Sequence, residues 1–382
     1  MNIDELYKIF QQYPSVETDT RKIKPGDIFF ALKGPNFNGN HYVTQAIEAG
    51  AAYCVTDEAI SFESDKIIQV ADSLTTLQGL AKKHRTQFNI PFIAITGSNG
   101  KTTTKELIKE VLSAGFITYT THGNLNNHIG VPLTILRIKL DAEMAVIEMG
   151  ANHQQEIASY CEYAMPTHGL ITNCGKAHLE GFGGVEGVRK GKGELFDYLR
   201  AHRGTAFVYS DYEYLQQMST GIHQVITYGN THGNITGEVV ADRNFLEVNI
   251  TKGAAISLIK TQLVGDYNLP NVLAAVCIGK FFGIRDEKIK EALEAYHPSN
   301  SRSQLLQLNG NDIILDAYNA NPTSMKAAIE NFIHMDGNKK VLILGGMMEL
   351  GTDSIKEHAQ IVNLIQSASW HKVILVGKDY TD

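Results

Sequence analysis

The feature that most constrains the fold is a glycine-rich turn between an apolar strand and a helix at residues 95–104. It reads Ile-Thr-Gly-Ser-Asn-Gly-Lys-Thr-Thr-Thr. Inward-facing N–H groups and a helix N-terminus attract phosphates, and Lys101 and Thr102 stand where such loops reach the phosphates and ligate Mg²⁺. The spacing is G-x-x-G-K-T, because Ile95 replaces the usual first glycine. Since strand, glycines, Lys-Thr and helix coincide, we interpret a nucleotide-binding loop rather than a turn with a surface lysine.

Apolar strands alternate with helices from residue 91 onward. Strands are predicted at 92–96, 144–148 and 169–173, and this alternation implies a parallel sheet covered by helices on both faces. Between 222 and 264 the strands are shorter and alternate polar with apolar residues, which predicts an antiparallel annex. The fold class is therefore α/β with a central parallel sheet.

Composition shifts divide the chain into three predicted domains. The polar segment 82–87 is interpreted as a boundary. A third alternating unit begins near residue 302, with strands predicted at 312–315, 341–344 and 373–376. The predicted domains are 1–90, 91–300 and 301–382. The third unit ends directly after a strand that would need cover on both faces, so we expect this domain to be incomplete.

Charge and hydropathy exclude several classes of function. With 34 Lys+Arg against 41 Asp+Glu, the net charge is −7, and no long basic run indicates a nucleic-acid partner. The longest apolar stretch, 272–284, is interrupted by Lys280 and is shorter than the roughly 20 residues that cross a bilayer. No secretory signal precedes the first domain. We expect a cytoplasmic protein without membrane insertion.

Three side chains are candidate metal ligands. Glu148 ends an apolar strand at the edge where α/β proteins bind ligands, so it is either a Mg²⁺ ligand or a helix cap. His178 also follows a strand, and taken alone a structural role is the simpler interpretation. The composition around Lys192 predicts a solvated helical face. An ammonium group cannot ligate a metal. If CO₂ added to its amine, however, the carbamate oxygens could hold Mg²⁺.

Six segments, in order along nearly the whole chain, resemble the Mur ligases of peptidoglycan synthesis. They are DTRKIKPGDIFFALKG from Asp19, TGSNGKTTTKEL from Thr96, GNLNNHIGVPLT from Gly123, IEMGAN from Ile147, DAYNANP from Asp316 and LGGMMELG from Leu344. The resemblance is closest to the ligases that add D-alanyl-D-alanine to UDP-N-acetylmuramoyl-tripeptide. It implies a UDP-sugar-binding N-terminal domain, a central ATPase domain and a Rossmann-like C-terminal domain that brings the dipeptide.

The resemblance assigns roles to individual residues. It implies that Thr102 and Glu148 ligate the ATP-bound Mg²⁺, and that His178 and a carbamylated Lys192 hold a second ion. The expected catalytic residues are Lys101, Glu148, His178 and Lys192. Tyr267 stands where the family has His, so this nucleotide contact differs. The residues assigned to ATP are Gly97, Ser98, Asn99, Gly100, Lys101, Thr102, Thr103, Asn268, Asn271, Arg302 and Asp316. Those assigned to the UDP-linked substrate are Arg21, Asn124, Asn126 and Asn127, and those assigned to the dipeptide are Asn319 and Asn321.

The implied reaction is ATP-dependent amide formation through an acyl phosphate. The asparagines could instead be ordinary turn residues. Other candidates are another Mur ligase, a folylpolyglutamate synthase-like ligase, which lacks the first 90 residues, and a non-catalytic nucleotide-binding paralogue. We expect a monomer. The sequence does not specify whether the third residue of the tripeptide is meso-diaminopimelate or lysine.

Overall fold

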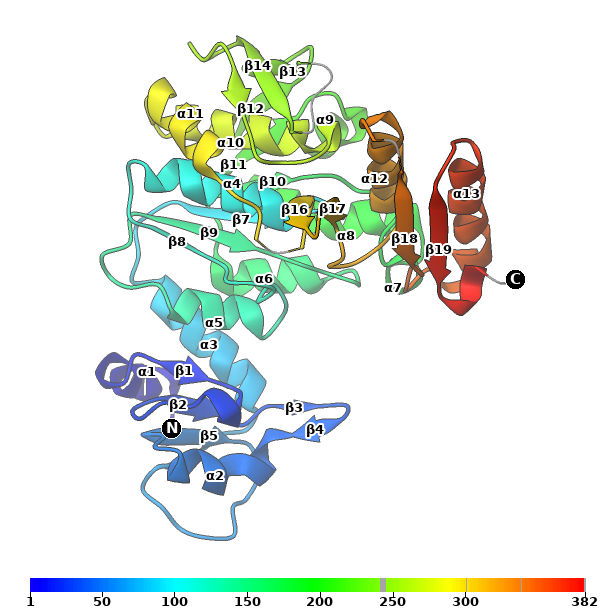
Figure 1. Ribbon diagram of the computed structural model, residues 1–382. Helices are drawn as coiled ribbons and strands as arrows, with labels where there is room; N and C mark the ends of the chain where they lie inside the picture. The colour runs from blue at the N-terminus through cyan, green and yellow to red at the C-terminus, as the bar shows by residue number, and fades with distance from the viewer. Residues whose placement is uncertain (241–244, 300, 338, 381–382) are drawn as a thin grey trace.

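The computed structural model describes residues 1–380 apart from 241–244, 300 and 338, and the chain forms three α/β units in succession (Figure 1). In the N-terminal unit a parallel sheet has the strand order β1-β2-β5-β6, with a β3–β4 hairpin beside it. Its elements are α1 (Ile3–Gln12), β1 (Val16–Glu17), β2 (Ile28–Phe30), β3 (Lys33–Gly34), β4 (Phe37–Asn38), α2 (Val43–Glu48), β5 (Tyr53–Thr56), β6 (Ile67–Gln69) and α3 (Ser73–Arg85). The first helix begins at a capping box in which Asn2 and Glu5 bond each other's backbone N–H groups.

The central unit is built on one large sheet. Among the described residues its strand order is β15-β14-β13-β12-β11-β10-β7-β9-β8. Its strands are β7 (Phe92–Thr96), β8 (Thr118–Thr120), β9 (Met144–Glu148), β10 (His168–Ile171), β11 (Thr205–Tyr209), β12 (Gln224–Gly229), β13 (Ile235–Val239), β14 (Glu247–Lys252) and β15 (Ile259–Lys260). Its helices are α4 (Lys101–Ser113), α5 (Gly130–Leu136), α6 (Glu156–Ala164), α7 (Leu179–Phe182), α8 (Val185–Ala201), α9 (Glu213–Met218), α10 (Leu269–Phe281) and α11 (Asp286–Ala295).

Helices cover both faces of this sheet, as the apolar strands predicted. Helices α4 and α10 pack on one face, and α5, α6 and α8 on the other. All residues of β7 and β9 are buried, which explains their continuous apolar sequence. The α/β class is confirmed. The carboxyl ends of β9, β7 and β10 lie next to one another because these strands pair in parallel.

The predicted antiparallel annex is only partly right. Strands β12 and β13 continue the parallel sheet, and the direction reverses only at β14 and β15. Helix α9 connects β11 to β12, and a helical crossover returns the chain in the same direction. Short strands that alternate polar with apolar residues carry no signal of pairing direction, so the sequence pattern could not separate the two cases.

The polar segment 82–87 is not an exposed linker. Its first four residues form the last turn of α3, which lies between the N-terminal and central units (Figure 1), and residues 86–87 follow as a turn. His84 and Arg85 are buried there because both find polar partners. The Arg85 guanidinium donates to the carbonyls of Phe88, Ala164 and Met165 at 2.9–3.0 Å, and it lies 3.7 Å from the centre of the Phe92 ring. The first two units are therefore tied together through α3.

The C-terminal unit contains β16 (Gln304–Leu308), β17 (Asn311–Leu315), α12 (Pro322–His334), β18 (Val341–Gly345), α13 (Ser354–Gln366) and β19 (Lys372–Val376). β16 and β17 form an antiparallel hairpin, and β18 pairs in parallel with β19. The sequence predicted the last three strands but missed β16. The domain boundaries near 90 and 300 stay predictions, and residue 300 lies outside the described residues.

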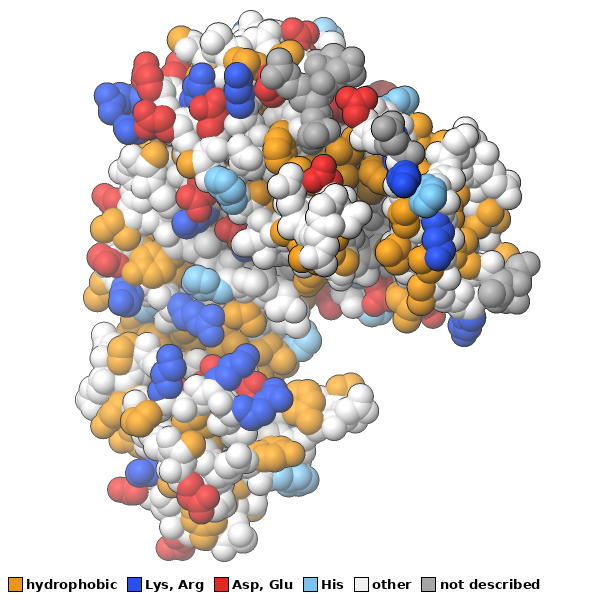
Figure 2. Space-filling model, viewed as in Figure 1, with side chains coloured by type: hydrophobic (Ala, Val, Ile, Leu, Met, Phe, Trp, Pro, Cys, Tyr) orange, Lys and Arg blue, Asp and Glu red, His pale blue; other side chains and the backbone are white. Residues whose placement is uncertain are grey.

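Helix α10 is apolar around its circumference because it is buried between α4 and the sheet. It has 13 residues, and no helix in the described part of the chain is long and apolar enough to cross a bilayer. Figure 2 shows that the molecule is hollowed between the N-terminal and C-terminal units, and that Lys and Arg side chains gather near the junction of the N-terminal and central units.

Replacing Arg85 by Met should lower the free energy of unfolding by about 2–4 kcal/mol, because three buried carbonyls lose their donor. Lys82→Met is the control: this lysine, on the same helix, is half exposed and lies 3.9 Å from Glu162, so its loss should change stability by less than about 0.5 kcal/mol. Urea titration followed by circular dichroism measures both. Equal effects of the two changes would contradict the role assigned to Arg85.

Candidate active site

The phosphate loop follows β7, between the ends of β9 and β10. Gly97 has φ 145° and Gly100 has φ 79°, both in the region that favours glycine. A Cβ on Gly97 would lie 2.0 Å from the Thr172 hydroxyl oxygen, and one on Gly100 would lie 2.8 Å from Asn271 Oδ1. Both glycines are therefore required by close packing as well as by backbone conformation.

The segment after β10 supports this loop. The Thr172 hydroxyl donates to Asn99 O at 2.6 Å, and Asn173 Oδ1 accepts from Asn99 N at 3.1 Å. Ser98 Oγ donates to Gly175 O at 2.9 Å. The sequence interpretation missed Thr172 and Asn173; their position directly after an apolar parallel strand was the signal that could have found them.

Lys101 begins α4, and its ammonium folds back over the loop. Nζ donates to the carbonyls of Gly97 at 2.8 Å and Ser98 at 3.1 Å. Burial lowers the pKa of Lys101 to about 8, and the charge of Glu148 partly opposes this shift. Thr103 is buried in the same helical turn. A cation thus lies at the loop carbonyls, within the segment predicted to bind phosphates.

Glu148 is fully buried at the end of β9. Its Oε1 accepts from Asn126 Nδ2 at 2.7 Å and from the Thr102 hydroxyl at 3.2 Å. Its Oε2 is buried and has no hydrogen-bond partner among the described residues. A carboxylate oxygen without a partner beside a threonine hydroxyl fits a hard divalent cation such as Mg²⁺.

Two asparagines assigned to ATP, Asn268 and Asn271, lie at the start of α10, which packs against α4. Asn271 Oδ1 accepts from the Thr104 hydroxyl at 2.9 Å, and its amide donates to Asn268 Oδ1 at 2.9 Å. Asn268 in turn donates to Val264 O at 2.9 Å. The structure therefore brings Asn271 against the phosphate loop, while Asn268 braces Asn271.

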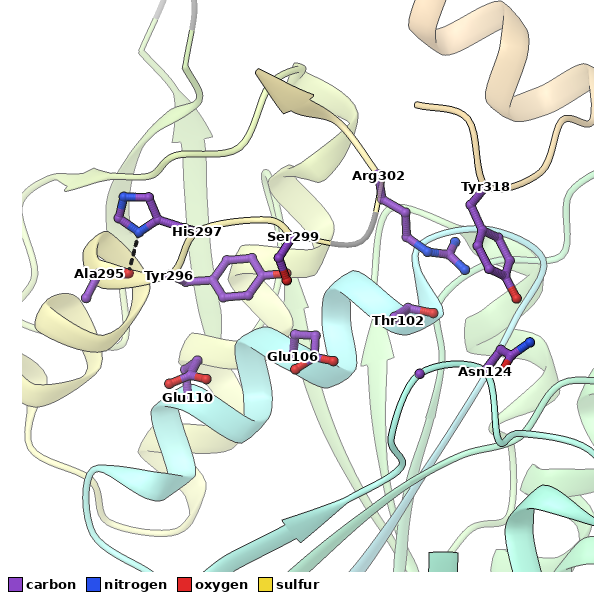
Figure 3. Close-up of a pocket in the computed structure, with 11 residues that line it drawn as sticks. Thr102, Glu106, Glu110, Asn124, Ala295, Tyr296, His297, Ser299, Arg302 and Tyr318 are labelled. Atoms are coloured by element: carbon purple, nitrogen blue, oxygen red, sulfur yellow. Dashed lines mark hydrogen bonds between the residues drawn. The ribbon is translucent and has the colours of Figure 1, made fainter. Parts of the chain in front are cut away.

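A cavity of about 570 Å³ runs along α4 from the phosphate loop (Figure 3). Figure 3 shows Glu106 and Glu110 on α4 facing Tyr296 and Ser299, with Arg302 reaching toward Tyr318 near Thr102. The Arg302 guanidinium lies 3.9 Å from the centre of the Tyr318 ring. The lining residues are Thr102, Glu106, Glu110, Gly123, Asn124, Ala295, Tyr296, His297, Ser299, Arg302 and Tyr318. Asp316, directly after β17, is exposed and is not part of this lining.

Lys192 and His178, the residues expected to hold a second metal ion, lie close enough to Lys101 for its charge to affect both. Lys192 is buried on α8, where Nζ donates to Ala151 O at 2.8 Å and lies 4.8 Å from the centre of the Phe182 ring. Burial, then the charge of Lys101, lowers the pKa of Lys192 to about 7. Burial also lowers the pKa of His178, although the nearby Glu349 carboxylate raises it. No group of three or more His, Cys, Asp and Glu side chains in the described residues could hold a metal alone.

The C-terminal unit touches the phosphate loop directly. Asn321 donates to Asn99 Oδ1 at 2.6 Å and caps α12 by accepting from Ser324 N at 3.0 Å. Lys176 Nζ donates to Glu357 Oε1 at 2.6 Å, and His178 Nδ1 contacts the Glu349 carboxylate. The sequence analysis assigned no role to these partners of the central unit, although Glu349 lies in the LGGMMELG segment that resembles the family. Glu357 lies outside the six quoted segments.

The remaining predicted residues lie further from the loop or have local roles. Arg21 is 84% exposed in the N-terminal unit and pairs with Asp19 at 2.8 Å. Asn127 Oδ1 accepts from Gly130 N at 2.9 Å, at the start of α5. Asn319 Oδ1 accepts from Ala320 N at 3.0 Å and is exposed after β17. The residues grouped around the loop are therefore Lys101, Thr102, Asn126, Glu148, Asn271 and Asn321.

Family models match three successive parts of the chain. The description "Mur ligase family, catalytic domain" matches residues 12–85, "Mur ligase middle domain" matches 95–279, and "Mur ligase, glutamate ligase domain" matches 301–382. Together the matches cover all three units of the structure.

Individual relatives agree with these models. The UDP-N-acetylmuramoyl-tripeptide--D-alanyl-D-alanine ligase of Bacillus subtilis (strain 168) is 37% identical over 95% of this chain and 80% of its own length. A crystal structure of MurF from Acinetobacter baumannii superposes with a TM-score of 0.89 at 32% identity, covering 96% of this chain and 81% of that one. MurF from Thermotoga maritima in complex with ADP has a TM-score of 0.84 at 26% identity, covering 95% of this chain and 88% of that one. These matches, which extend over all three units, show that this chain belongs to the Mur ligase family.

Proposed function

We propose that this chain is an ATP-dependent ligase that joins D-alanyl-D-alanine to UDP-N-acetylmuramoyl-tripeptide. The observation that carries the proposal is the phosphate loop opening onto the cavity along α4, with the unpartnered Glu148 oxygen beside Thr102. The Bacillus subtilis relative named for this reaction matches over most of both chains. The two substrates are those in the name of this relative, and the geometry of the phosphate loop supports the use of ATP.

The reaction proceeds by two displacements. The terminal carboxylate of the tripeptide attacks the γ-phosphorus of ATP, which gives an acyl phosphate and releases ADP. The dipeptide amine then attacks the acyl carbon through a tetrahedral intermediate, and inorganic phosphate and a proton leave. Lys101 can move from the Gly97 and Ser98 carbonyls to the phosphoryl oxygens, where its charge stabilises the transition state.

Glu148 Oε2 and the Thr102 hydroxyl would hold the Mg²⁺ ion that accompanies ATP. When bound, Mg²⁺ offsets charge on the phosphate oxygens. The amide of Asn126 fixes the other oxygen of Glu148 at 2.7 Å, so the free oxygen keeps its direction.

A carbamate on Lys192, with His178 beside it, would hold a second Mg²⁺. Because the pKa of Lys192 is lowered to about 7 by burial, a large fraction of its amine is neutral near neutral pH. A neutral amine adds to CO₂ by forming one N–C bond and releasing one proton. The buried setting supports the proposal because it lowers the cost of losing the ammonium form.

The N-terminal unit would bind the UDP-linked substrate, and the C-terminal unit would bind the dipeptide. A cavity of about 270 Å³ at the junction of the N-terminal and central units is lined by the basic residues Lys22, Lys24 and Arg137 and the acidic residues Glu17 and Asp27, among others. The excess of basic side chains suits a UDP-linked substrate. Asn319 and Asn321 would contact the dipeptide. Since ATP and UDP-linked precursors are cytoplasmic metabolites, the proposal assigns the reaction to the cytoplasm.

Continued ADP production over many turnovers should require both UDP-N-acetylmuramoyl-tripeptide and D-alanyl-D-alanine, because the dipeptide must consume the acyl phosphate. Lys101→Met should lower kcat on the order of 10³-fold, because one electrostatic group is lost. A coupled ADP assay with the meso-diaminopimelate and lysine forms of the tripeptide measures both effects. Unchanged thermal unfolding shows that the variant folds. ADP release with a UDP-linked dipeptide and a free amino acid instead would assign the chain to another ligase of the family.

Replacing Lys192 by Ala should reduce turnover by at least roughly 100-fold, with partial recovery in short-chain carboxylic acids that occupy the vacated position. Lys190→Ala, an exposed lysine on the same helix, is the matched control. ¹³C NMR after incubation with ¹³C-bicarbonate should show a carbamate signal in the original protein that is absent from Lys192→Ala. A missing signal together with no rescue would contradict the carbamate.

Asn319→Ala should raise the KM for D-alanyl-D-alanine about 10-fold without changing stability, as expected for one lost hydrogen bond. Asn321→Ala should raise the same KM and also destabilise the C-terminal unit by about 1 kcal/mol, because it removes the cap of α12. Trp370, the only tryptophan, stacks on Phe332 of α12 and reports this unfolding by fluorescence. Normal KM values in both variants would show that these asparagines do not bind the dipeptide.

A further inference from the structure

Lys105 is a fully buried lysine that no step of the proposed reaction uses. It lies on α4 one turn after Thr102, and none of its side-chain surface is exposed. Its Nζ donates to Thr121 O at 2.5 Å and lies 2.8 Å from Glu106 Oε1. Burying an ammonium costs free energy that an apolar side chain of the same length would not. Its presence here therefore calls for a specific role.

Thr121 links this lysine to the end of β9. It is also fully buried, and it lies directly after β8. While its carbonyl accepts from Lys105, its hydroxyl oxygen accepts from Glu148 N at 3.0 Å. Thr121 thus connects Lys105 of α4 to the backbone of Glu148 through two hydrogen bonds.

The contacts form a closed ring. From Glu148 the ring continues through Oε1 to the Thr102 hydroxyl at 3.2 Å, and Thr102 returns to Lys105 through one turn of α4. The ring fixes the Glu148 backbone from one side and its carboxylate from the other. The carboxylate oxygen left outside the ring is Oε2, which is buried and unpartnered.

We infer that Lys105 is a positioning residue that acts through Thr121 to aim Glu148 Oε2 at the divalent cation of the nucleotide. The inference rests on the cation site of the proposed function. Without the Lys105 ammonium, Thr121 O loses its donor and the start of the 121–129 loop can move. Glu148 N then loses a fixed acceptor, and the carboxylate can rotate away from the Thr102 side.

A purely structural brace for α4 makes a different prediction. Since α4 begins at the phosphate loop, loosening the helix would weaken nucleotide binding whether or not a metal is present. A positioning role weakens metal binding selectively. Two affinities therefore distinguish the roles. A structural brace lowers the affinity for ADP in EDTA, whereas a positioning residue lowers only the affinity of the ADP-loaded protein for the metal.

The test uses the full chain, with Mn²⁺ as the probe and electron paramagnetic resonance to count free Mn²⁺. Lys105→Met should weaken Mn²⁺ binding to the ADP-loaded protein roughly 10-fold, the usual effect of losing a partner behind a metal ligand. The affinity for ADP in EDTA, measured by calorimetry, should stay within about twofold of the original. Lys109→Met is the matched control, because Lys109 is a partly exposed lysine one turn further along α4, 2.8 Å from Glu110.

Two changes at Thr121 keep the test decisive should Lys105→Met fail to fold. Thr121→Val removes the acceptor of Glu148 N at nearly constant volume and should reproduce the loss of Mn²⁺ affinity. Thr121→Ser keeps the hydroxyl and should recover most of it. Equal weakening of ADP binding in EDTA, or normal Mn²⁺ binding by Thr121→Val, would overturn the inference. If the original ADP-loaded protein bound no Mn²⁺, this result would contradict the proposed cation site and therefore also the inference.

Discussion

The position of β7 between β9 and β10 is the constraint on which the rest of the site depends. Because the three strands run in parallel, the loop after β7 is bordered by Glu148 on one side and Thr172 on the other. The fit is so close that a Cβ on Gly97 would lie 2.0 Å from the Thr172 hydroxyl oxygen. A larger residue would have to push the segment after β10 away from the loop, and with it Asn173 and its bond to Asn99. The chemistry at this edge therefore follows from strand order before any catalytic side chain is considered.

How much of this could be predicted depends on the length and burial of each pattern. β7 and β9 were predicted to their final residues, because strands covered on both faces are continuous apolar runs. The direction of β12 and β13 was not, because short alternating strands pair either way. In the site, the strand-end rule placed Glu148 at the ligand-binding edge of the sheet, and the family resemblance grouped it with Thr102, whose hydroxyl bonds Glu148 Oε1 at 3.2 Å. The contact between Asn99 and Asn321 could not be foreseen, since it joins loops 222 residues apart whose sequences show only turn-forming amides.

Lysine side chains near the phosphate loop, two of them buried, give the site a positive charge that favours a polyphosphate. Lys101, Lys105 and Lys192 each place the ammonium on backbone carbonyls: those of Gly97 and Ser98, of Thr121, and of Ala151. Carbonyl acceptors offset part of the desolvation cost, and Lys105 also lies 2.8 Å from the Glu106 carboxylate. Lys101 and Lys192 also repel each other, which contributes to the lowered pKa of Lys192. When both amines are protonated, the negative charge of a bound triphosphate would offset this repulsion.

The contacts between the central and C-terminal units begin at residues next to the nucleotide groups. Asn99 of the phosphate loop bonds Asn321, Lys176 bonds Glu357, and His178 contacts Glu349. Each such bond contributes about 1 kcal/mol, and charged ones somewhat more, which is small compared with the free energy of binding a nucleotide. Asn321 is also the cap of α12, so the loop that holds phosphates is bonded to the first turn of the helix that follows Asn319. A movement of the phosphate loop on nucleotide binding would therefore act directly, through the bond between Asn99 and Asn321, on the segment proposed to hold the dipeptide.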